Sequence, residues 1–174
     1  MSRGRGRPER SQQLTREHIL DTALALLDSD HRGLTMRALA SRLGVTPMSL
    51  YHHFEGRTGL LLALAERVYA QVLAQTSDLH TLLVSYYEAV GRHPQLTLAL
   101  FAHEAFGGVT RHISERLSQL LQGRVAEPLL WRDILIDHAH GSGLALAAAR
   151  KDPQRARTLE AEYRLAVDQL LAHR

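Results

Sequence analysis

Arginine side chains are concentrated at the start of the chain, where guanidinium groups can hold a polyanion. The first ten residues contain four arginines and one acid, and residues 1–60 together hold nine arginines and six acids. Residues 61–174 hold twelve basic and twelve acidic residues, so the net charge of +3 lies in the N-terminal third. A basic segment ahead of a folded domain favours a polyanionic partner, although a tail that only aids solubility would have the same composition.

A sharper feature lies within this basic arm. The run Arg5-Gly6-Arg7-Pro8 resembles the core of an AT-hook, in which two arginines on an extended backbone enter the A·T minor groove. Glycine allows the backbone to approach the groove floor, and proline keeps the chain extended. Four residues carry little weight alone, so the interpretation depends on whether a DNA-binding domain follows.

The residues offer little support for catalysis or metal binding. The chain has no cysteine, which excludes disulfides, thiol catalysis and thiolate metal sites. No phosphate loop, nucleophile elbow or metalloprotease motif is present. Eleven histidines suggest a metal sensor, but His138-x-His140 separates its two rings on a helix, and no His-x-x-x-His pair falls in a predicted helix. We therefore expect no enzyme, no metal and no cofactor.

The bulk properties are those of an ordinary globular protein. The chain has 174 residues, 45% of them hydrophobic, and its longest apolar runs are far too short to span a bilayer. No hydrophobic run follows the basic start, so the sequence predicts no secretory signal. We expect a cytoplasmic protein without a membrane partner.

Short helices with clear caps are predicted directly after the arm. Thr15 is a good N-cap, and apolar residues then recur at helical spacing up to Leu27. Thr35 caps a second helix that Gly44 ends, and Thr46-Pro47 begins a third helix at once. A longer helix follows over residues 58–75. A helix, a short glycine turn and a helix form the helix-turn-helix layout, although a plain three-helix bundle contains similar turns.

The residue identities distinguish these alternatives. The segment from Leu34 to Phe54, LTMRALASRLGVTPMSLYHHF, closely resembles the DNA-binding signature of the tetracycline-repressor (TetR) family, as does Arg57 followed by Leu60-Leu61. The resemblance covers residues 15–65. One departure is Arg57-Thr58-Gly59, where the family usually has a lysine and an acidic pair; arginine keeps the positive charge.

The resemblance implies an all-α fold with an N-terminal helix-turn-helix three-helix DNA-binding domain and a helical ligand-binding and dimerisation domain. We expect a flexible basic arm over residues 1–14, the DNA-binding domain over 15–62, and the effector-binding and dimerisation domain over 63–174. Further helices are predicted over residues 77–91, 94–105, 110–122, 128–150 and 153–172.

The matching positions suit contacts with DNA. Thr35 offers a hydroxyl and a helix N-terminus to a phosphate, and Arg37 can reach a phosphate or a guanine edge. Pro47 and Met48 can make only apolar contacts, for example with a thymine methyl group. The resemblance adds phosphate contacts for a tyrosine and histidine pair and for the basic residue that follows. The predicted DNA-contacting residues are Arg5, Arg7, Thr35, Arg37, Thr46, Pro47, Met48, Ser49, Tyr51, His53 and Arg57.

By the same resemblance, the second domain is expected to sense a small molecule. Its pocket should lie among the middle helices, lined by apolar residues with few polar groups, although most candidates are equally good core residues. The candidate pocket residues are Tyr86, Tyr87, Phe101, His103, Phe106, Trp131, His138 and Ser142.

The last two long helices are expected to form a four-helix bundle with those of a second copy. Leu130, Ile134, Leu135 and His138 are predicted to run down one side of the first, and an intramolecular core would have the same composition. The resemblance therefore implies a ligand-responsive transcriptional regulator, and a repressor is the commoner kind in the family. It would bind a palindromic double-stranded DNA operator as a homodimer, be nucleoid-associated when bound, and be released by an unidentified small-molecule effector. The alternative is an architectural or effector-independent DNA-binding protein.

Overall fold

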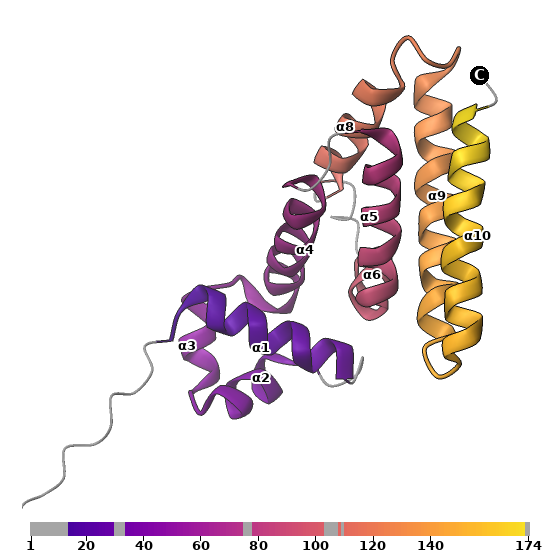
Figure 1. The fold of residues 1–174 in the computed structure, drawn as a ribbon. Coiled ribbons are helices and arrows are strands. Elements are labelled where there is room, and N and C mark those ends of the chain that lie inside the picture. Colours follow the sequence, from indigo (N-terminus) through magenta and orange to yellow (C-terminus); the bar gives the residue numbers. More distant parts are fainter. Residues whose placement is uncertain (1–13, 30–33, 75–77, 103–107, 109, 173–174) are drawn as a thin grey trace, which may run out of the picture.

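The computed structural model describes residues 14–29, 34–74, 78–102, 108 and 110–172. These residues form nine helices and no strand, which confirms the all-α class (Figure 1). None of the described helices is both long enough and apolar enough to cross a bilayer.

Three short helices form the N-terminal unit, and each begins at a predicted cap. Helix α1 is Arg16–Ser29, α2 is Met36–Leu43 and α3 is Pro47–Tyr51. The Thr15 hydroxyl accepts a hydrogen bond from the backbone N–H of His18 at 3.2 Å, and Thr35 accepts one from Ala38 at 3.0 Å. These bonds satisfy donors that the first turn of a helix leaves without a partner.

The turn between α2 and α3 depends on Gly44. Its φ of 68° is left-handed, a conformation that a side chain disfavours. The N–H groups of Gly44 and Val45 return to the carbonyls of Ser41 and Ala40, closing α2 in the predicted way. The chain then turns directly into α3.

Helix α4, Gly56–Ala74, begins two residues before the predicted start. The difference arises at Gly56, whose φ of 69° completes the turn after α3, so Arg57 already lies in the first turn of α4. Helix α4 packs against α1 on one side and against the helices that follow on the other, and it leads from the N-terminal unit into the rest of the molecule (Figure 1).

The remaining helices form one bundle. They are α5 Leu79–Arg92, α6 Pro94–Phe101, α8 Arg111–Leu121, α9 Pro128–Ala148 and α10 Pro153–Ala172. Helices α9 and α10 run antiparallel along one edge, and α5 packs against α9 (Figure 1). Two glycines allow this close approach, because a Cβ on Gly143 would lie 2.7 Å from the Val90 side chain and one on Gly91 would lie 2.8 Å from Leu146.

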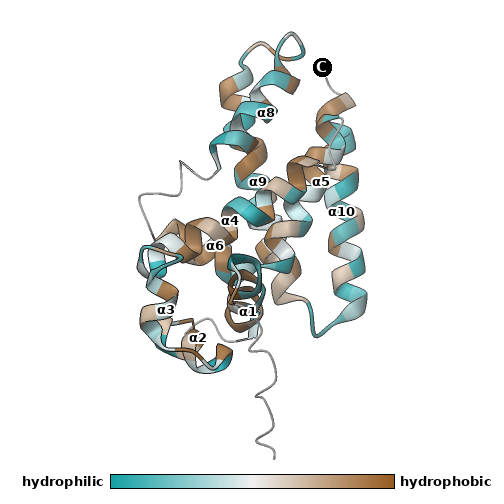
Figure 2. Ribbon diagram, turned by 90° about the vertical axis from the view of Figure 1, so that its left-hand side faces the viewer, coloured by the Kyte–Doolittle hydropathy of each residue, from teal (hydrophilic) through white to brown (hydrophobic). Residues whose placement is uncertain are grey.

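The hydrophobic residues of α9 do not share one side, which corrects the sequence prediction. Leu135 is buried, whereas Leu130 and Ile134 are 53% and 44% exposed. Residues 134 and 135 are about 100° apart around a helix, so only one of them can face α5 and α8. Helices α4 and α6 are mainly hydrophobic, whereas α10 carries many hydrophilic residues on its outer side (Figure 2).

Candidate nucleic-acid interface

Helix α3 presents large side chains to solvent at one side and to the core at the other. Met48 is 65% exposed and Tyr51 is 50% exposed, whereas Leu50 is fully buried and Phe54 is 5% exposed. Leu50 and Phe54 are therefore core residues. Met48 and Tyr51 are thus the large side chains of this five-residue helix that a bound molecule such as DNA can reach.

The first turn of α3 uses its own hydroxyl groups. The Thr46 hydroxyl accepts the backbone N–H of Ser49 at 3.4 Å, and the two side-chain hydroxyls lie 3.0 Å apart in a hydrogen bond. Pro47 is exposed at the first helical position. The Ser49 hydroxyl therefore helps to hold the cap, and it keeps limited capacity for a base edge.

Helix α2 begins beside this face with two exposed polar residues. The Thr35 hydroxyl oxygen accepts the Ala38 N–H in the cap, which leaves its own O–H, together with the first backbone N–H groups of α2, as donors for an anion. Arg37 is exposed in the first turn, next to Met36, which is buried. Thr35 fixes where α2 starts, and Arg37 is the side chain that is free to reach outward.

Arg57 is tied to the loop before α2. Its Nε–H donates to the backbone carbonyl oxygen of Leu34 at 2.9 Å, across 23 residues. This bond orients the guanidinium group while the residue as a whole remains exposed. Arginine can make this contact and still offer terminal N–H groups to a phosphate, whereas lysine has only one nitrogen.

Sequence reasoning missed Arg16 at the start of α1. Its guanidinium donates to the backbone carbonyl oxygen of His53 at 3.0 Å and lies 4.5 Å from the centre of the Phe54 ring. Arg16 thus braces the turn after α3, including half-buried His53. No local pattern signals this role, because the partners are 37 residues apart. Two other predicted contacts, Arg5 and Arg7, lie outside the described residues.

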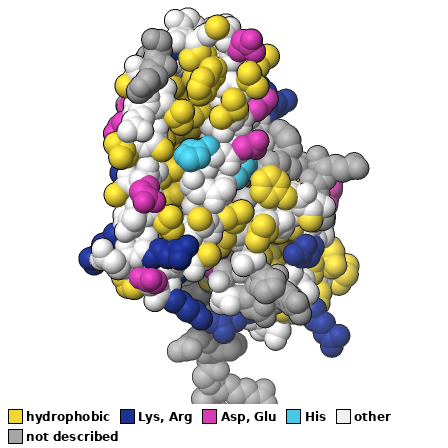
Figure 3. Space-filling view, turned by 90° about the vertical axis from the view of Figure 1, so that its right-hand side faces the viewer, with side chains coloured by type: hydrophobic (Ala, Val, Ile, Leu, Met, Phe, Trp, Pro, Cys, Tyr) yellow, Lys and Arg dark blue, Asp and Glu magenta, His cyan; other side chains and the backbone are white. Residues whose placement is uncertain are grey.

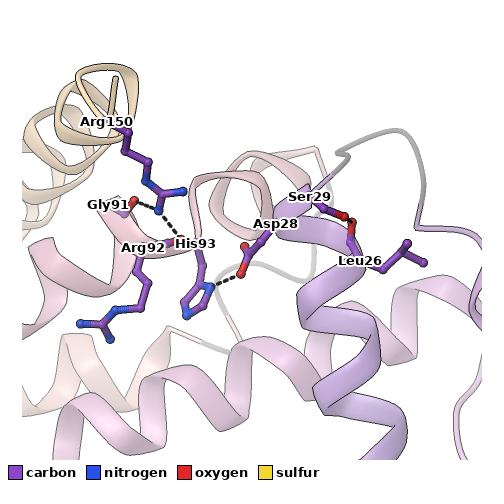
Figure 4. A network of polar contacts seen from close by, with 7 residues as sticks. All are labelled: Leu26, Asp28, Ser29, Gly91, Arg92, His93 and Arg150. Atoms are coloured by element: carbon purple, nitrogen blue, oxygen red, sulfur yellow. Dashed lines mark hydrogen bonds and ion pairs between the residues drawn. The ribbon is translucent and has the colours of Figure 1, made fainter. Parts of the chain in front are cut away.

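Polar contacts connect this N-terminal unit to the bundle (Figure 4). His93, between α5 and α6, has its Nδ1 2.8 Å from a carboxylate oxygen of Asp28 near the end of α1. Arg150, after α9, donates to the backbone carbonyls of Gly91 and Arg92. The end of α1, the end of α5 and the end of α9 therefore meet in one region.

The candidate effector residues fall into separate groups within the bundle. Tyr86 is fully buried, and its hydroxyl lies 2.7 Å from Nε2 of His140. The Phe101 and Tyr69 rings lie 5.0 Å from His140 and 5.5 Å from Tyr86 respectively. Burial raises the pKa of Tyr69 to about 12 and lowers the pKa of His140. The tyrosine stays neutral at neutral pH, and burial favours the neutral imidazole.

A second group lies toward α10. The Tyr87 and Tyr163 rings are stacked 4.0 Å apart, and the His138 ring is stacked 5.2 Å from Tyr163. The Tyr163 hydroxyl donates to the carbonyl of Leu83 at 3.2 Å, whereas the structure gives the Tyr87 hydroxyl no hydrogen-bond partner among the described residues. Burial, together with the carboxylates of Glu160 and Glu88, raises the pKa of Tyr87 to about 12.

The other predicted pocket residues do not join either group. Trp131 lines a small cavity of about 10 Å³ with Leu135 and residues of α5, α8 and α10. Ser142 is half-buried on α9, and His103 and Phe106 lie outside the described residues. The larger apolar groove, about 300 Å³, is lined by Glu66, Tyr69, Ala70, Leu73, Gly108 and His112.

The sequence prediction missed Tyr69 and His140 in this region. Both look like ordinary helical residues in the sequence, and only packing brings them to Tyr86. Among the described residues, no group of three or more His, Asp or Glu side chains is placed to hold a metal ion.

Comparison with known protein families matches the N-terminal part of the chain. A family profile described as "Bacterial regulatory proteins, tetR family" matches residues 19–64. The tetracycline repressor protein class C of Escherichia coli is 53% identical over 55 residues, 31% of this chain and 25% of that protein. That match spans about a quarter of the curated relative, and the profile match over residues 19–64 contains α2 and α3.

Solved structures are similar over nearly the whole chain. BioQ of Mycobacterium smegmatis has a TM-score of 0.72 at 26% identity, covering 93% of this chain and 100% of that one. A tetracycline repressor variant of Acinetobacter baumannii AYE, solved in complex with minocycline, has a TM-score of 0.66 at 24% identity, covering 92% and 96% of the two chains. The bundle thus has the same arrangement as these proteins.

Proposed function

Because the chain belongs to the tetracycline-repressor family of bacterial regulatory proteins, we propose that it is a ligand-responsive transcriptional repressor that binds a palindromic operator as a homodimer. Residues 15–62 are the DNA-binding domain in this proposal, and residues 63–174 bind the effector and the second copy. The protein acts in the cytoplasm, on the DNA that it regulates.

The observation that carries the DNA-binding part is the exposed face of α3. Met48 and Tyr51 are solvent-exposed on a helix that follows a tight glycine turn, and Met48 lies in the first turn of α3, the end that a helix-turn-helix inserts into the major groove. Arg37 and Arg57 flank this helix, and each can neutralise a phosphate. The apolar start of α3 discriminates bases weakly, so much of the specificity is expected from Arg37, DNA shape and the basic arm.

Exposed apolar residues on α9 and α10 support the homodimer. Four leucine and isoleucine side chains of these helices are between 44% and 61% exposed, namely Leu129, Leu130, Ile134 and Leu165. Figure 3 shows hydrophobic side chains spread over this face of the molecule. A second copy would cover them and form a four-helix bundle. Two recognition helices about 34–36 Å apart could then read successive major grooves of a palindrome.

The effector part of the proposal rests on the interior of the bundle. The neighbour from Acinetobacter baumannii was solved with minocycline, and its likeness to this chain supports an effector site here. Here Tyr86 and His140 supply polar groups to the buried interior of the bundle. An effector that separates α4, α5 or α9 would act on α1 through the His93–Asp28 contact, and it would favour a dimer that no longer fits the operator.

Selection of bound sites from random DNA, with the mass of the bound protein determined alongside, tests the proposal. An inverted repeat bound by dimers is the expected result. Weak binding without a consensus would contradict it and would favour an architectural DNA-binding protein.

The selected operator then permits an effector screen. Compounds are tested for release of the labelled operator, with the Tyr86→Phe variant as a comparison, because it loses the hydroxyl that meets His140. Release that is weakened in Tyr86→Phe, with unchanged operator affinity in the absence of compound, would support the effector assignment. An operator complex that no compound releases would favour an effector-independent regulator.

A further inference from the structure

A second basic surface lies far from the arm, at the turn that joins α9 and α10. Residues 150–157 contain four basic residues and one acid, although residues 61–174 as a whole are neutral. Lys151, Arg155 and Arg157 are all exposed. We call these three residues, together with Arg92, the basic turn. Arg92 is exposed at the end of α5. Figure 3 shows Lys and Arg side chains gathered along the lower edge of this face.

No contact within the folded protein explains why these positive charges are there. Arg155 and Arg157 lie in the first turns of α10, where the partial positive charge of the helix end disfavours cations. Asp152 is the one acid in the turn, and its side chain accepts the backbone N–H of Arg155 at 3.1 Å, so it caps α10. The structure gives none of the four residues of the basic turn an ion-pair partner among the described residues.

The surroundings hold the basic turn in place without neutralising it. Arg150 donates to the carbonyls of Gly91 and Arg92, which fixes the turn against the end of α5 (Figure 4). Arg92, Arg150 and Arg157 line one open groove of about 660 Å³. Two glutamates also line it, but Glu88 is paired with Arg164, which leaves Glu160 as the remaining acid of the groove.

The basic turn is at the same end of the molecule as the helix-turn-helix. In Figure 1 the turn between α9 and α10 lies at the lower end of the bundle, where α1, α2 and α3 also lie. A homodimer through the α9 and α10 face would bring both turns next to the two-fold axis. They would then face the centre of the operator, between the two half-sites.

We propose that the basic turn is a second DNA contact, which binds backbone phosphates at the centre of the operator. The inference rests on the proposed function, because it requires the dimer and the operator. A duplex fits better than a membrane surface, since residues 149–157 include no large apolar side chain to enter a bilayer. Phosphate contacts carry no sequence information, so the basic turn would add affinity and leave the preferred operator unchanged.

The test compares two double variants that lose the same charge. Arg155→Gln with Arg157→Gln removes two charges per chain from the basic turn, and Arg111→Gln with Arg116→Gln removes two from α8, which lies away from the helix-turn-helix. Operator affinity is measured from about 50 to 200 mM salt, and the dimer mass is checked for each protein. Because cations are disfavoured at the start of α10, the first variant should fold at least as well as the wild type.

The basic turn variant is expected to bind operator and random DNA more weakly by the same factor, about tenfold or more at low salt. Four charges are lost per dimer, so the slope of log K against log salt should become shallower by about two to four. The α8 variant should keep the wild-type slope. Equal behaviour of the two variants would overturn the proposal, as would a change in the selected operator sequence.

Neutral methylphosphonates at the centre of the operator provide a second measurement. They should weaken wild-type binding and have little further effect on the basic turn variant, because that variant has already lost the protein's half of the same contact. An equal effect on both proteins would also overturn the proposal. If the wild type itself selects no operator, the proposed function fails. If the wild type and the basic turn variant bind the operator equally well, only the proposed contact of the basic turn is refuted.

Discussion

The close approach of α5 and α9 predicts that Gly143→Ala destabilises the protein. A Cβ at position 143 would lie 2.7 Å from Cβ and Cγ1 of Val90 and 2.9 Å from the backbone carbonyl oxygen of Tyr87. Ordinary contacts between carbon atoms are about 3.5–4.0 Å. The carbonyl belongs to the backbone of α5 and cannot rotate away, so the two helices must separate.

Two opposing effects set the magnitude. Overpacking of a well-packed region costs about 1–3 kcal/mol, and the backbone contact places this site toward the upper end. Replacement of glycine by alanine within a helix contributes about 0.8–1 kcal/mol in the other direction. We therefore expect a net loss of about 1–2 kcal/mol, which for a protein of this size lowers Tm by roughly 2–8 °C.

Two matched variants make the measurement specific. Gly59→Ala places its Cβ 3.4 Å from Cβ of Glu55, an ordinary contact, and should stabilise α4 by about 0.5–1 kcal/mol. Gly91→Ala meets the Leu146 side chain, which can rotate, so its loss should be smaller than that of Gly143→Ala.

Urea unfolding followed by circular dichroism, at one protein concentration for all variants, gives the free energies of unfolding. The reasoning is refuted if Gly143→Ala is as stable as the wild type while Gly59→Ala is stabilised as expected. That result would mean that α5 and α9 can separate without loss of packing.

Four further predictions concern pH, DNA and assembly. Burial lowers the pKa of His140 from its ordinary value of 6.5, so the unfolded chain binds a proton that the folded protein resists, and stability should fall as pH drops below about 6.5. His140→Gln should reduce this slope of unfolding free energy against pH, and an unchanged slope would contradict the prediction. Arg57→Ala should weaken binding to all DNA sequences alike, with a shallower salt dependence. Arg57→Lys should keep the salt dependence but lose about 0.5–1.5 kcal/mol of stability, because it lacks the Nε contact. If Arg57→Ala changed the sequence preference and kept its affinity for random DNA, Arg57 would not bind phosphate. Deletion of residues 1–10 should lower affinity most at operators with A·T-rich flanks, and an equal loss at G·C-rich flanks would remove the minor-groove role of the arm. Ile134→Glu should shift the protein toward monomers in sedimentation, whereas Leu98→Glu, at a similarly exposed position on α6, should leave the dimer intact; dimers of Ile134→Glu as stable as those of the wild type would argue against the α9 and α10 interface.

The cap and turn residues predicted the helices well. Thr15, Thr35 and Thr46 each accept the expected backbone N–H, and Gly44 ends α2 in the left-handed conformation. These interactions join residues no more than five positions apart, so their physical chemistry is complete within a short piece of sequence. Among the first four helices, the one start that differs from its predicted position is that of α4, at Gly56, where a glycine could serve either the turn or the helix.

The predicted DNA contacts and the predicted effector residues differ in how well sequence alone could place them. The predicted DNA contacts that the structure describes lie on and around two short helices that follow one another, so their positions depend on one tight turn. The effector candidates that the structure describes come from three helices, α5, α6 and α9, and the structure divides Tyr86 from Tyr87 although they are neighbours in sequence. Adjacent residues on a helix point about 100° apart, so the rotation of each helix decides which cluster each residue joins.

The sequence by itself determined the helices, their caps, the helix-turn-helix and the concentration of charge in the arm, because each depends on local spacing or composition. Only the tertiary structure decided the partners that are distant in sequence, such as Asp28 with His93 and Tyr86 with His140. It also decided which side of α9 is left exposed, and it placed the basic turn at the end of the molecule that carries the helix-turn-helix. These features depend on how whole helices pack and rotate against one another, which is set by the summed burial of many side chains.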